Sequence, residues 1–414
     1  METHEASSSL TPHARGTPRP VHSSGVVLRA VLQEGLAQPQ AAIKVGGVPL
    51  PGEIDWPAVC AVAHRARIAP IVYQCLRSAS LPVPGDVMDW FRVQHYDTVA
   101  RNLASLNVLR TVLEMLAGAG IPAMAFKGPA LAQLGYEMAR SWKDLDILVG
   151  PGAIDRVESV LFAAGYRLMP DPPHPNHRRY AVRGDARDTA LEIHFDISDP
   201  LLAYRPDVPA IWSRSGAAKI LGLTARVPDL TDHLLLTVMQ LPHHRWSLRL
   251  VLDIWQVIRR WQEAVDWPAF FERARAWRML ALTRSALCML TTSLGASLPE
   301  SVASAVRPVG YYDRLRLEIA TQSISEQFEH PFRPRVMWLA PFVVTERPAD
   351  VLRILTRRLL AGGEAMGDGR IETAVRRNLK SIEVLPEVIR VIAASVLPPP
   401  QGHGDVGSRK GSTR

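Results

Sequence analysis

The chain has 414 residues, of which 47% are hydrophobic and 21% charged, a balance that is ordinary for a globular protein. No apolar run reaches the roughly 18 residues that a membrane span needs, and the first twenty residues lack the apolar core of a secretion signal. Its three cysteines (Cys60, Cys75, Cys288) form neither a disulfide framework nor a metal-spacing motif, so we expect a reduced, cytoplasmic protein.

The formal net charge of +8 has two interpretations: attraction to polyanions such as nucleic acid, or an arginine-rich composition without functional meaning. We favour the second. Basic residues do gather near the C-terminus, but apolar residues alternate with them as on an ordinary amphipathic helix surface. We therefore do not expect nucleic-acid binding there; the residues are Arg353, Arg357, Arg358, Arg370, Arg376, Arg377 and Lys380.

Changes in composition divide the chain into five segments. Residues 1–25 and 398–414 are rich in Pro, Gly and Ser, which predicts disordered tails. We expect an N-terminal helical region at 26–119, a core of strands and helices at 120–228 and a C-terminal helical region at 229–397.

The N-terminal region ends in a long helical pattern. Apolar residues recur at helical spacing from Leu103 to Leu116, and Gly118 and Gly120 predict where the helix stops.

From residue 121 the pattern changes to alternating strands and helices. "IPAMAF" is a short strand followed by a turn into a helix, and "DLDILVG" is a second strand. The helix "PGAIDRVESVLFAAG" has Pro near its start and Gly at its end. "YRLM" and "TALEIHFDI" complete a compact unit of three strands or more, and the chain is helical again beyond residue 229.

Two strands of this unit carry acidic residues on a single face. Alternation places Asp144 and Asp146 together, and in "LEIHFDI" it places Glu192, His194 and Asp196 together. If the two strands are neighbours, three carboxylates converge and repel one another unless a cation neutralises them. Mg²⁺ or Mn²⁺ fits best, because these ions take oxygen ligands and leave positions for water and phosphate.

Three residues upstream are suited to phosphate. Lys127 and Gly128 lie where the first strand meets a helix, whose N–H groups and dipole attract anions. The planar fork of Arg140 could hold a phosphate or the acceptor, or it could pair with a neighbouring acid. Together with the carboxylates, these residues indicate metal-assisted phosphoryl or nucleotidyl transfer.

Each of these residues also has a simpler structural interpretation. The Asp pair could be a solvated strand start, Lys127 a surface lysine and Glu192 an ion-pair partner. His194 could be a partly buried strand histidine, and Asp196 is expected to cap its strand end.

The run "FKGPALAQLGYEMARSWKDLDILV" resembles the uncharacterised nucleotidyltransferase family of the polymerase-β-like superfamily. The resemblance covers about residues 50–300. It includes "AHRARIAPIVYQCL" upstream and "HHRWSLRLVLDIWQVIRR" with "VDWPAFFERARAW" downstream.

The resemblance implies an α+β fold: a small mixed nucleotidyltransferase sheet flanked by helical regions from both ends of the chain. It implies that Asp144, Asp146 and Glu192 bind metal. Lys127 and Gly128 occupy the place of the superfamily's nucleotide-binding Gly-Gly or Gly-Ser turn. Pro129 departs from that pattern, because no second glycine or serine hydroxyl is available for phosphate.

Within the downstream part, His243 and His244 could line the acceptor side together with His194, and Asp253 could anchor them. Two adjacent histidines on a regular helix cannot both face one site, and three dispersed residues are not a zinc signature. Helix capping and polar contacts between helices are the preferred interpretation of this segment.

We therefore expect a metal-dependent enzyme that moves an NMP from an NTP, with ATP preferred, to an acceptor and releases pyrophosphate. The acceptor is a small molecule, a peptide or protein, or an RNA. The alternative is a catalytically silent module that senses nucleotide or docks a partner.

Overall fold

The structure is a computed structural model of the whole chain. It describes residues 21–22, 24–37, 44–45, 48–49, 53–79, 81–135, 139–170, 174–181, 190–198, 204–244, 246–329, 345 and 350. The C-terminal tail expected at 398–414 and the basic C-terminal residues lie outside this part. So does the N-terminal tail expected at 1–25, except for residues 21–22, which form a strand, and 24–25, which begin a helix.

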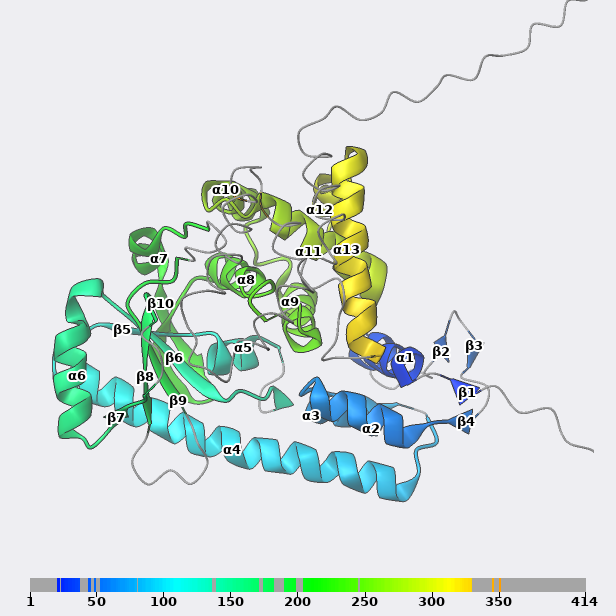
Figure 1. The fold of residues 1–414 in the computed structure, drawn as a ribbon, viewed down its shortest axis with the longest axis horizontal. Coiled ribbons are helices and arrows are strands. Elements are labelled where there is room, and N and C mark those ends of the chain that lie inside the picture. The colour runs from blue at the N-terminus through cyan, green and yellow to red at the C-terminus, as the bar shows by residue number, and fades with distance from the viewer. Residues whose placement is uncertain are drawn as a thin grey trace, which may run out of the picture.

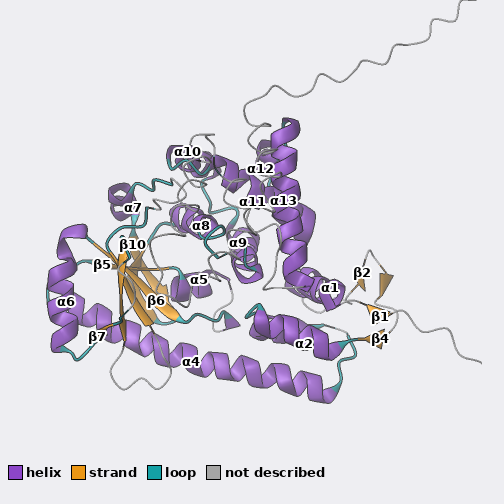
Figure 2. Ribbon diagram, in the orientation of Figure 1, coloured by secondary structure: helices purple, strands orange, loops and turns teal. Residues whose placement is uncertain are grey.

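A five-stranded mixed sheet with the strand order β5-β6-β9-β8-β7 lies toward one end of the molecule, beside α6 (Figures 1 and 2). Strands β6 and β9 are parallel, and the other neighbouring pairs are antiparallel. The bounds are β5 (Ala123–Phe126), β6 (Asp144–Val149), β7 (Arg167–Leu168), β8 (His177–Ala181) and β9 (Ala190–His194).

One face of this sheet is apolar and covered by helices. Leu145, Ile147 and Ile193 are buried on it, as alternation along β6 and β9 requires. They pack with α6 (Ile154–Ala163) and with the C-terminal half of α4 (Gly85–Gly118). A 3-10 helix, Pro151–Ala153, leads into α6.

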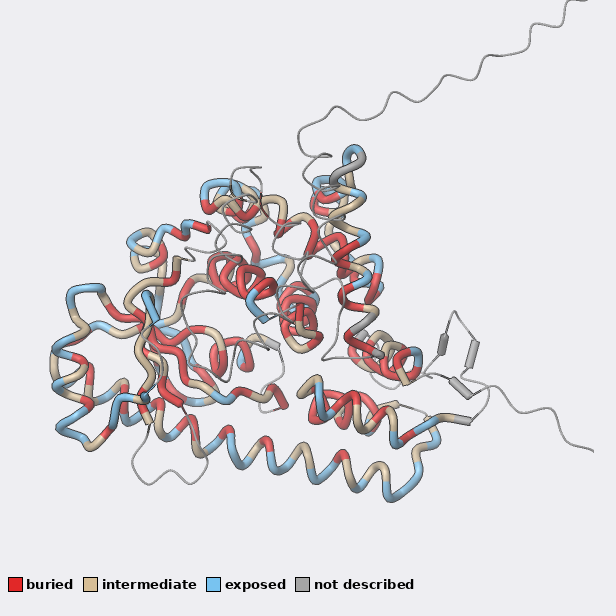
Figure 3. The backbone as a smooth tube through the Cα atoms, in the orientation of Figure 1, coloured by how far each residue is buried: buried red, intermediate tan, exposed pale blue. Residues whose placement is uncertain are grey.

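Helix α4 extends beyond the sheet to the N-terminal helices, below which it runs in Figure 1. Buried and exposed positions alternate along it (Figure 3). Its buried apolar side chains near the sheet follow a helical spacing: Leu106, Leu109, Val112 and Leu116. The helix ends at Gly118, and Gly120 has a φ of 65°, as the two glycines predicted.

The opposite face of the sheet meets α5 (Gly128–Gly135) and the larger helical assembly. Helix α1 near the N-terminus packs against α13, although most of the chain separates them (Figure 1). The remaining helices are α1 (Ser24–Ala37), α2 (Trp56–Arg65), α3 (Ala69–Ser78), α7 (Val208–Arg214), α8 (Leu230–Met239), α9 (Leu248–Trp261), α10 (Trp267–Ala276), α11 (Leu280–Leu294), α12 (Glu300–Val306) and α13 (Gly310–Glu329).

Several of these helices begin at the same sequence pattern, an aspartate followed two residues later by proline. In α2, α7 and α10 the carboxylate of Asp55, Asp207 or Asp266 accepts from a backbone N–H of the first turn. The proline costs no hydrogen bond there, because N–H groups of the first turn have no partner within the helix.

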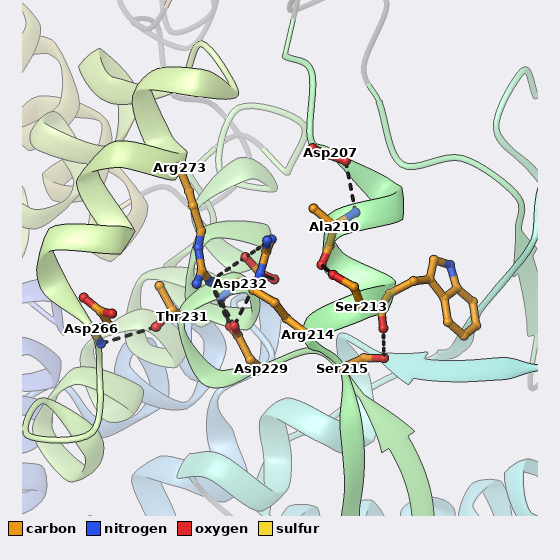
Figure 4. Close-up of polar contacts among 11 residues, drawn as sticks. Asp207, Ala210, Ser213, Arg214, Ser215, Asp229, Thr231, Asp232, Asp266 and Arg273 are labelled. Atoms are coloured by element: carbon orange, nitrogen blue, oxygen red, sulfur yellow. Dashed lines mark hydrogen bonds and ion pairs between the residues drawn. The ribbon is translucent and has the colours of Figure 1, made fainter.

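A four-residue ion cluster fastens α7, α8 and α10 together (Figure 4). The fully buried Asp232 accepts from Arg214 Nε at 2.8 Å and from Arg273 Nη1 at 2.9 Å. Arg273 also binds the Asp229 carboxylate, which caps α8, at 2.9 Å. Burial raises the pKa of Asp232 even though both arginines oppose the effect.

Short strands outside this region are β1 (Val21–His22), β2 (Lys44–Val45), β3 (Val48–Pro49) and β4 (Glu53–Ile54). Besides these short strands and α7, two further elements are absent from the sequence expectations. The first is β8, whose sequence "HRRYA" has charged residues on both faces and so lacks an apolar alternation. The second is the hairpin of β10 (Gly216–Ile220) and β11 (Leu223–Val227). Its turn residues Leu221 and Gly222 both have positive φ, as a two-residue hairpin turn requires.

The observed architecture confirms the expected α+β class, with a small mixed sheet between helices from both ends of the chain. None of the described helices combines the length and hydropathy that a membrane span requires. The segment boundaries at 119 and 228 stay predictions.

The pH dependence of stability provides a test of the helical packing around His233 in α8. Its side chain is 2% exposed, and its Nε2 has no hydrogen-bond partner among the described residues. Burial, and secondarily Arg140, lower the pKa of His233 to about 4. The unfolded chain therefore binds more protons than the folded chain between pH 6.5 and 4, and stability falls as the pH falls through that range.

When the pH is lowered from 7 to 5, the unfolding free energy of the wild type should fall by about 2 kcal/mol more than that of His233→Leu. Urea unfolding at both pH values measures this difference. Equal losses in the two proteins would show that His233 is not held in its neutral form.

Candidate active site

The site begins with the register of β6 and β9. Asp146 is the parallel partner of Glu192, and Phe126 at the end of β5 is the antiparallel partner of Asp146. The two acidic strands are therefore neighbours, as the metal hypothesis requires. Because successive residues alternate faces, Asp144, Asp146 and Glu192 lie on the face opposite the one that packs on α4 and α6.

Asp146, Glu192 and His194 form a compact group of ligand atoms within 4.8 Å of one another. Nε2 of His194 lies 2.9 Å from Oδ1 of Asp146 and 3.5 Å from Oε2 of Glu192. The structure thus places His194 within the carboxylate group. We had expected it on the acceptor side.

Lys127 supplies a positive charge to the same group. Its Nζ lies 2.6 Å from Oδ1 of Asp146. Burial would lower the pKa of Lys127, but Asp146 and the other two carboxylates outweigh it and raise the pKa. In return, Lys127 and His194 overcome the burial of Asp146 and hold the pKa of that carboxyl well below its usual range. The charge repulsion that the sequence predicts is therefore offset here by protein cations.

The backbone at Lys127 is unusual, with a φ of 56°. This left-handed conformation ends β5 and allows α5 to start at once, with Gly128 as its first residue. A side-chain carbon at Gly128 would lie 3.4 Å from both the carbonyl oxygen of Asp144 and Cβ of Trp142. These are ordinary contact distances, so the packing of α5 against the start of β6 does not by itself require glycine here.

Asp144 is the remaining carboxylate. Within the described part of the chain it makes no ion pair at contact distance. Desolvation, together with the charges of Asp146 and Glu192, raises the pKa of Asp144 against the opposing effect of Lys127. A half-buried carboxylate left in this state is a natural ligand for a bound cation.

Strand β8 contributes two residues that the sequence expectations did not include. Nε of Arg179 lies 3.2 Å from Oε1 of Glu192, its register partner. The ring of His177 lies 4.8 Å from that of His194, centroid to centroid. Desolvation, and next the charge of His194, lower the pKa of His177 to about 4. On a strand, His177 and Arg179 share one face, and Arg178 and Tyr180 share the other. Recognising "HRRYA" as a strand would therefore have placed His177 and Arg179 together.

The side chain of Arg140 binds protein groups, which is not the arrangement expected of a phosphate-binding residue. It is 2% exposed, and its Nε and Nη2 bind the two carboxylate oxygens of Asp253 at 3.0 and 2.9 Å. Nη1 of Arg140 donates to the carbonyl of Gly128 at 3.2 Å. The backbone carbonyl of Arg140 accepts from the side-chain amide of Asn102 in α4 at 2.9 Å. Of the two interpretations from the sequence, pairing with an acid describes this residue.

His243 and His244 lie on the turn between α8 and α9, so the premise that they sit on a regular helix was wrong. Both are exposed at this turn. Desolvation, followed by the charges of Arg249 and Lys127, lowers the pKa of His244 to about 4. His244 therefore lies within electrostatic range of the carboxylate group. Asp253 binds Arg140, a polar contact between elements of the kind we favoured for this segment.

A model of a family described as "uncharacterised nucleotidyltransferase" matches residues 52–295, which is more than half of the chain. The chain belongs to this family. The assignment confirms the resemblance found in the sequence and makes the protein a nucleotidyltransferase family member. No curated protein matches the chain at a significant level.

Solved structures with partial likeness to this nucleotidyltransferase include two of the antibiotic-resistance factor ANT(2'')-Ia. The solution structure is 12% identical with a TM-score of 0.32, over 46% of this chain and 96% of that one. The crystal structure with adenylyl-2''-tobramycin is 14% identical with a TM-score of 0.32, over 42% and 97%. A nucleotidyltransferase-like protein from Paracoccidioides brasiliensis is 14% identical with a TM-score of 0.32, over 47% and 94%. These scores are too low to establish a shared overall fold.

The pairing of Arg140 with Asp253 predicts a large effect on stability. Arg140→Met leaves the Asp253 carboxylate buried without its partner and should lower the unfolding free energy by about 3–5 kcal/mol. The double variant Arg140→Met/Asp253→Leu removes the lone charge and should recover most of that loss. Urea unfolding measures both. A single variant as stable as wild type would contradict the assignment of this pair.

Proposed function

We propose that this protein transfers a nucleoside monophosphate from an NTP, preferably ATP, to an acceptor and releases pyrophosphate. The observation that carries the proposal is the convergence of Asp146 and Glu192 from parallel strands, with Asp144 one alternation away. Membership in the nucleotidyltransferase family supports it. The acceptor is a small molecule, a peptide or protein, or an RNA end.

The donor set fits a divalent cation of the kind we expected, Mg²⁺ or Mn²⁺. Asp146 and Glu192 offer oxygen atoms and His194 an imidazole nitrogen within 4.8 Å of one another, and Asp144 adds a carboxylate without an ion-pair partner. Carboxylate oxygens suit both ions. When bound, such an ion supplies positive charge to the phosphate oxygens at which negative charge develops.

The protein's own residues would orient the phosphates. Lys127 stays protonated in the folded state, and its ammonium group can move from Asp146 to bind an incoming phosphate. The N-terminal turn of α5 begins at Gly128 beside it and presents backbone N–H groups. Arg140 is buried too deeply to touch the nucleotide; it holds this turn and α9 in place and is a positioning residue.

Asp146→Asn and Glu192→Gln should each abolish metal-dependent nucleotide transfer. Losing one metal ligand removes several kcal/mol of transition-state stabilisation, or about a hundredfold or more in rate. Incubation with each labelled NTP and Mg²⁺ or Mn²⁺, with products of neighbouring genes as acceptors, measures the transfer. EDTA should stop it in wild type.

Binding of Mn²⁺, measured as loss of the free-ion signal in electron paramagnetic resonance, tests the site without an acceptor. Asp146→Asn should weaken it, whereas Asp155→Asn makes the same charge change on the exposed start of α6 and should not. Tight nucleotide binding with no transfer to any acceptor would favour a silent sensing module instead. Mn²⁺ binding that is unaffected by Asp146→Asn would refute the site.

A further inference from the structure

Two arginines outside the carboxylate group lie within its electrostatic range and make no described ion pair. Arg67 follows the end of α2, and Arg249 is the second residue of α9. Asp144 interacts with both of them over a longer range, and the two guanidinium groups also act on each other. Within the described residues, neither has a carboxylate within 4.0 Å, in contrast to Arg140, Arg214 and Arg273.

The segment that leads into β6 holds both arginines in place. Oγ of Ser141 donates to the carbonyl of Arg67 at 3.2 Å, and Nη1 of Arg249 donates to the carbonyl of Ser141 at 2.8 Å. Ser141 lies three residues before Asp144. Arg67 is thus held by its backbone, and its guanidinium is not used for this contact. Arg249 uses one of its donors and keeps Nε and Nη2 for another acceptor.

Arg67 closes α2 in a left-handed backbone conformation, as Arg278 does after α10. Its N–H binds the carbonyl of His64 at 3.0 Å, and that of Ile68 binds the carbonyl of Ala63 at 2.9 Å. This pattern closes a helix through a left-handed residue, which is usually glycine. Arg67 adopts a φ of 59° with a full side chain, a conformation that is costly for any residue other than glycine.

The pKa shifts of Arg249 and Arg67 describe the electrostatic environment of their guanidinium groups. Desolvation, and next Arg140, lower the pKa of Arg249 to about 10, and desolvation also lowers the pKa of Arg67. Asp253 and Asp144 oppose the shift at Arg249, and Asp144 opposes it at Arg67, but among the described residues no carboxylate lies within 4.0 Å of either guanidinium. Partly desolvated cations without a contacting carboxylate suit an anionic ligand. Arginine forks match the geometry of phosphate oxygens.

We propose that Arg67 and Arg249 bind the phosphate chain of the NTP beside Asp144. This assignment rests on the proposed function and adds its phosphate-binding residues. Pro129, the second residue of α5, has no N–H, so the helix start offers one donor fewer to a phosphate. Arg140 ties the first turn of α5 to α9, the helix that carries Arg249, and the two arginines would supply further donors.

Arg67→Gly provides the decisive experiment, because it separates folding from binding. Glycine relieves the left-handed backbone, so the midpoint of thermal unfolding should rise. Affinity for a non-hydrolysable ATP analogue with Mn²⁺, measured by calorimetry, should fall at least tenfold, and so should affinity for pyrophosphate. Binding of Mn²⁺ alone should be unchanged. Arg65→Gln is the matched control: it removes an exposed arginine two residues away, and the affinity for the analogue should be unchanged.

Arg249→Gln should lower the affinity for the analogue to a similar degree. Arg249→Lys should retain part of the affinity, because it keeps the charge but loses the planar guanidinium. Analogue affinity unchanged in both Arg67→Gly and Arg249→Gln overturns this assignment and leaves the proposed function standing. So does an equal loss in Arg65→Gln. A wild-type protein that binds neither Mn²⁺ nor the analogue overturns the proposed function and the assignment with it.

Discussion

The buried pairing of Arg140 with Asp253 is the interaction on which the geometry of the site depends. Through one guanidinium it joins the segment before β6, the first turn of α5 and helix α9, and Asn102 of α4 holds its backbone. These elements are far apart in the chain, from α4 to α9. Because two charges buried at 3% and 1% side-chain exposure tolerate little rearrangement, the pair fixes where Gly128 and Asp144 meet.

Around that fixed point the protein balances an acidic centre with basic and hydrogen-bonding side chains from separate elements. Lys127 and His194 bind Asp146, Arg179 binds Glu192, and Asp144 is left without a contact partner in the described part of the chain. This balance explains how carboxylates can gather on a sheet before any metal is bound. It also explains why Lys127 has a strained backbone: the residue must end β5 and reach Asp146 at the same time.

The two faces of the sheet have different roles. One face is apolar and packs on α4 and α6, whereas the other turns its polar end toward α5 and the turn before α9. The ion cluster of Arg214, Asp232 and Arg273 stabilises the helices behind that turn but contributes no group to the site (Figure 4). Arg67 and Arg249 differ from this cluster, because neither has an ion-pair partner among the described residues, and we propose that a ligand supplies it.

The sequence by itself determined the elements whose signal is local. Alternation placed Asp144 with Asp146 and Glu192 with His194, and helical spacing and glycines set the course of α4, because these patterns follow from the geometry of one strand or helix. Long-range pairing was decided only in the tertiary structure. The register of β6 on β9, the capture of Arg140 by Asp253 and the approach of Arg67 to Arg249 join residues far apart in the chain. No local pattern specifies such contacts. Strand β8 escaped prediction because its two faces serve different partners, Glu192 of the site and Glu158 of α6, so it carries charge on both.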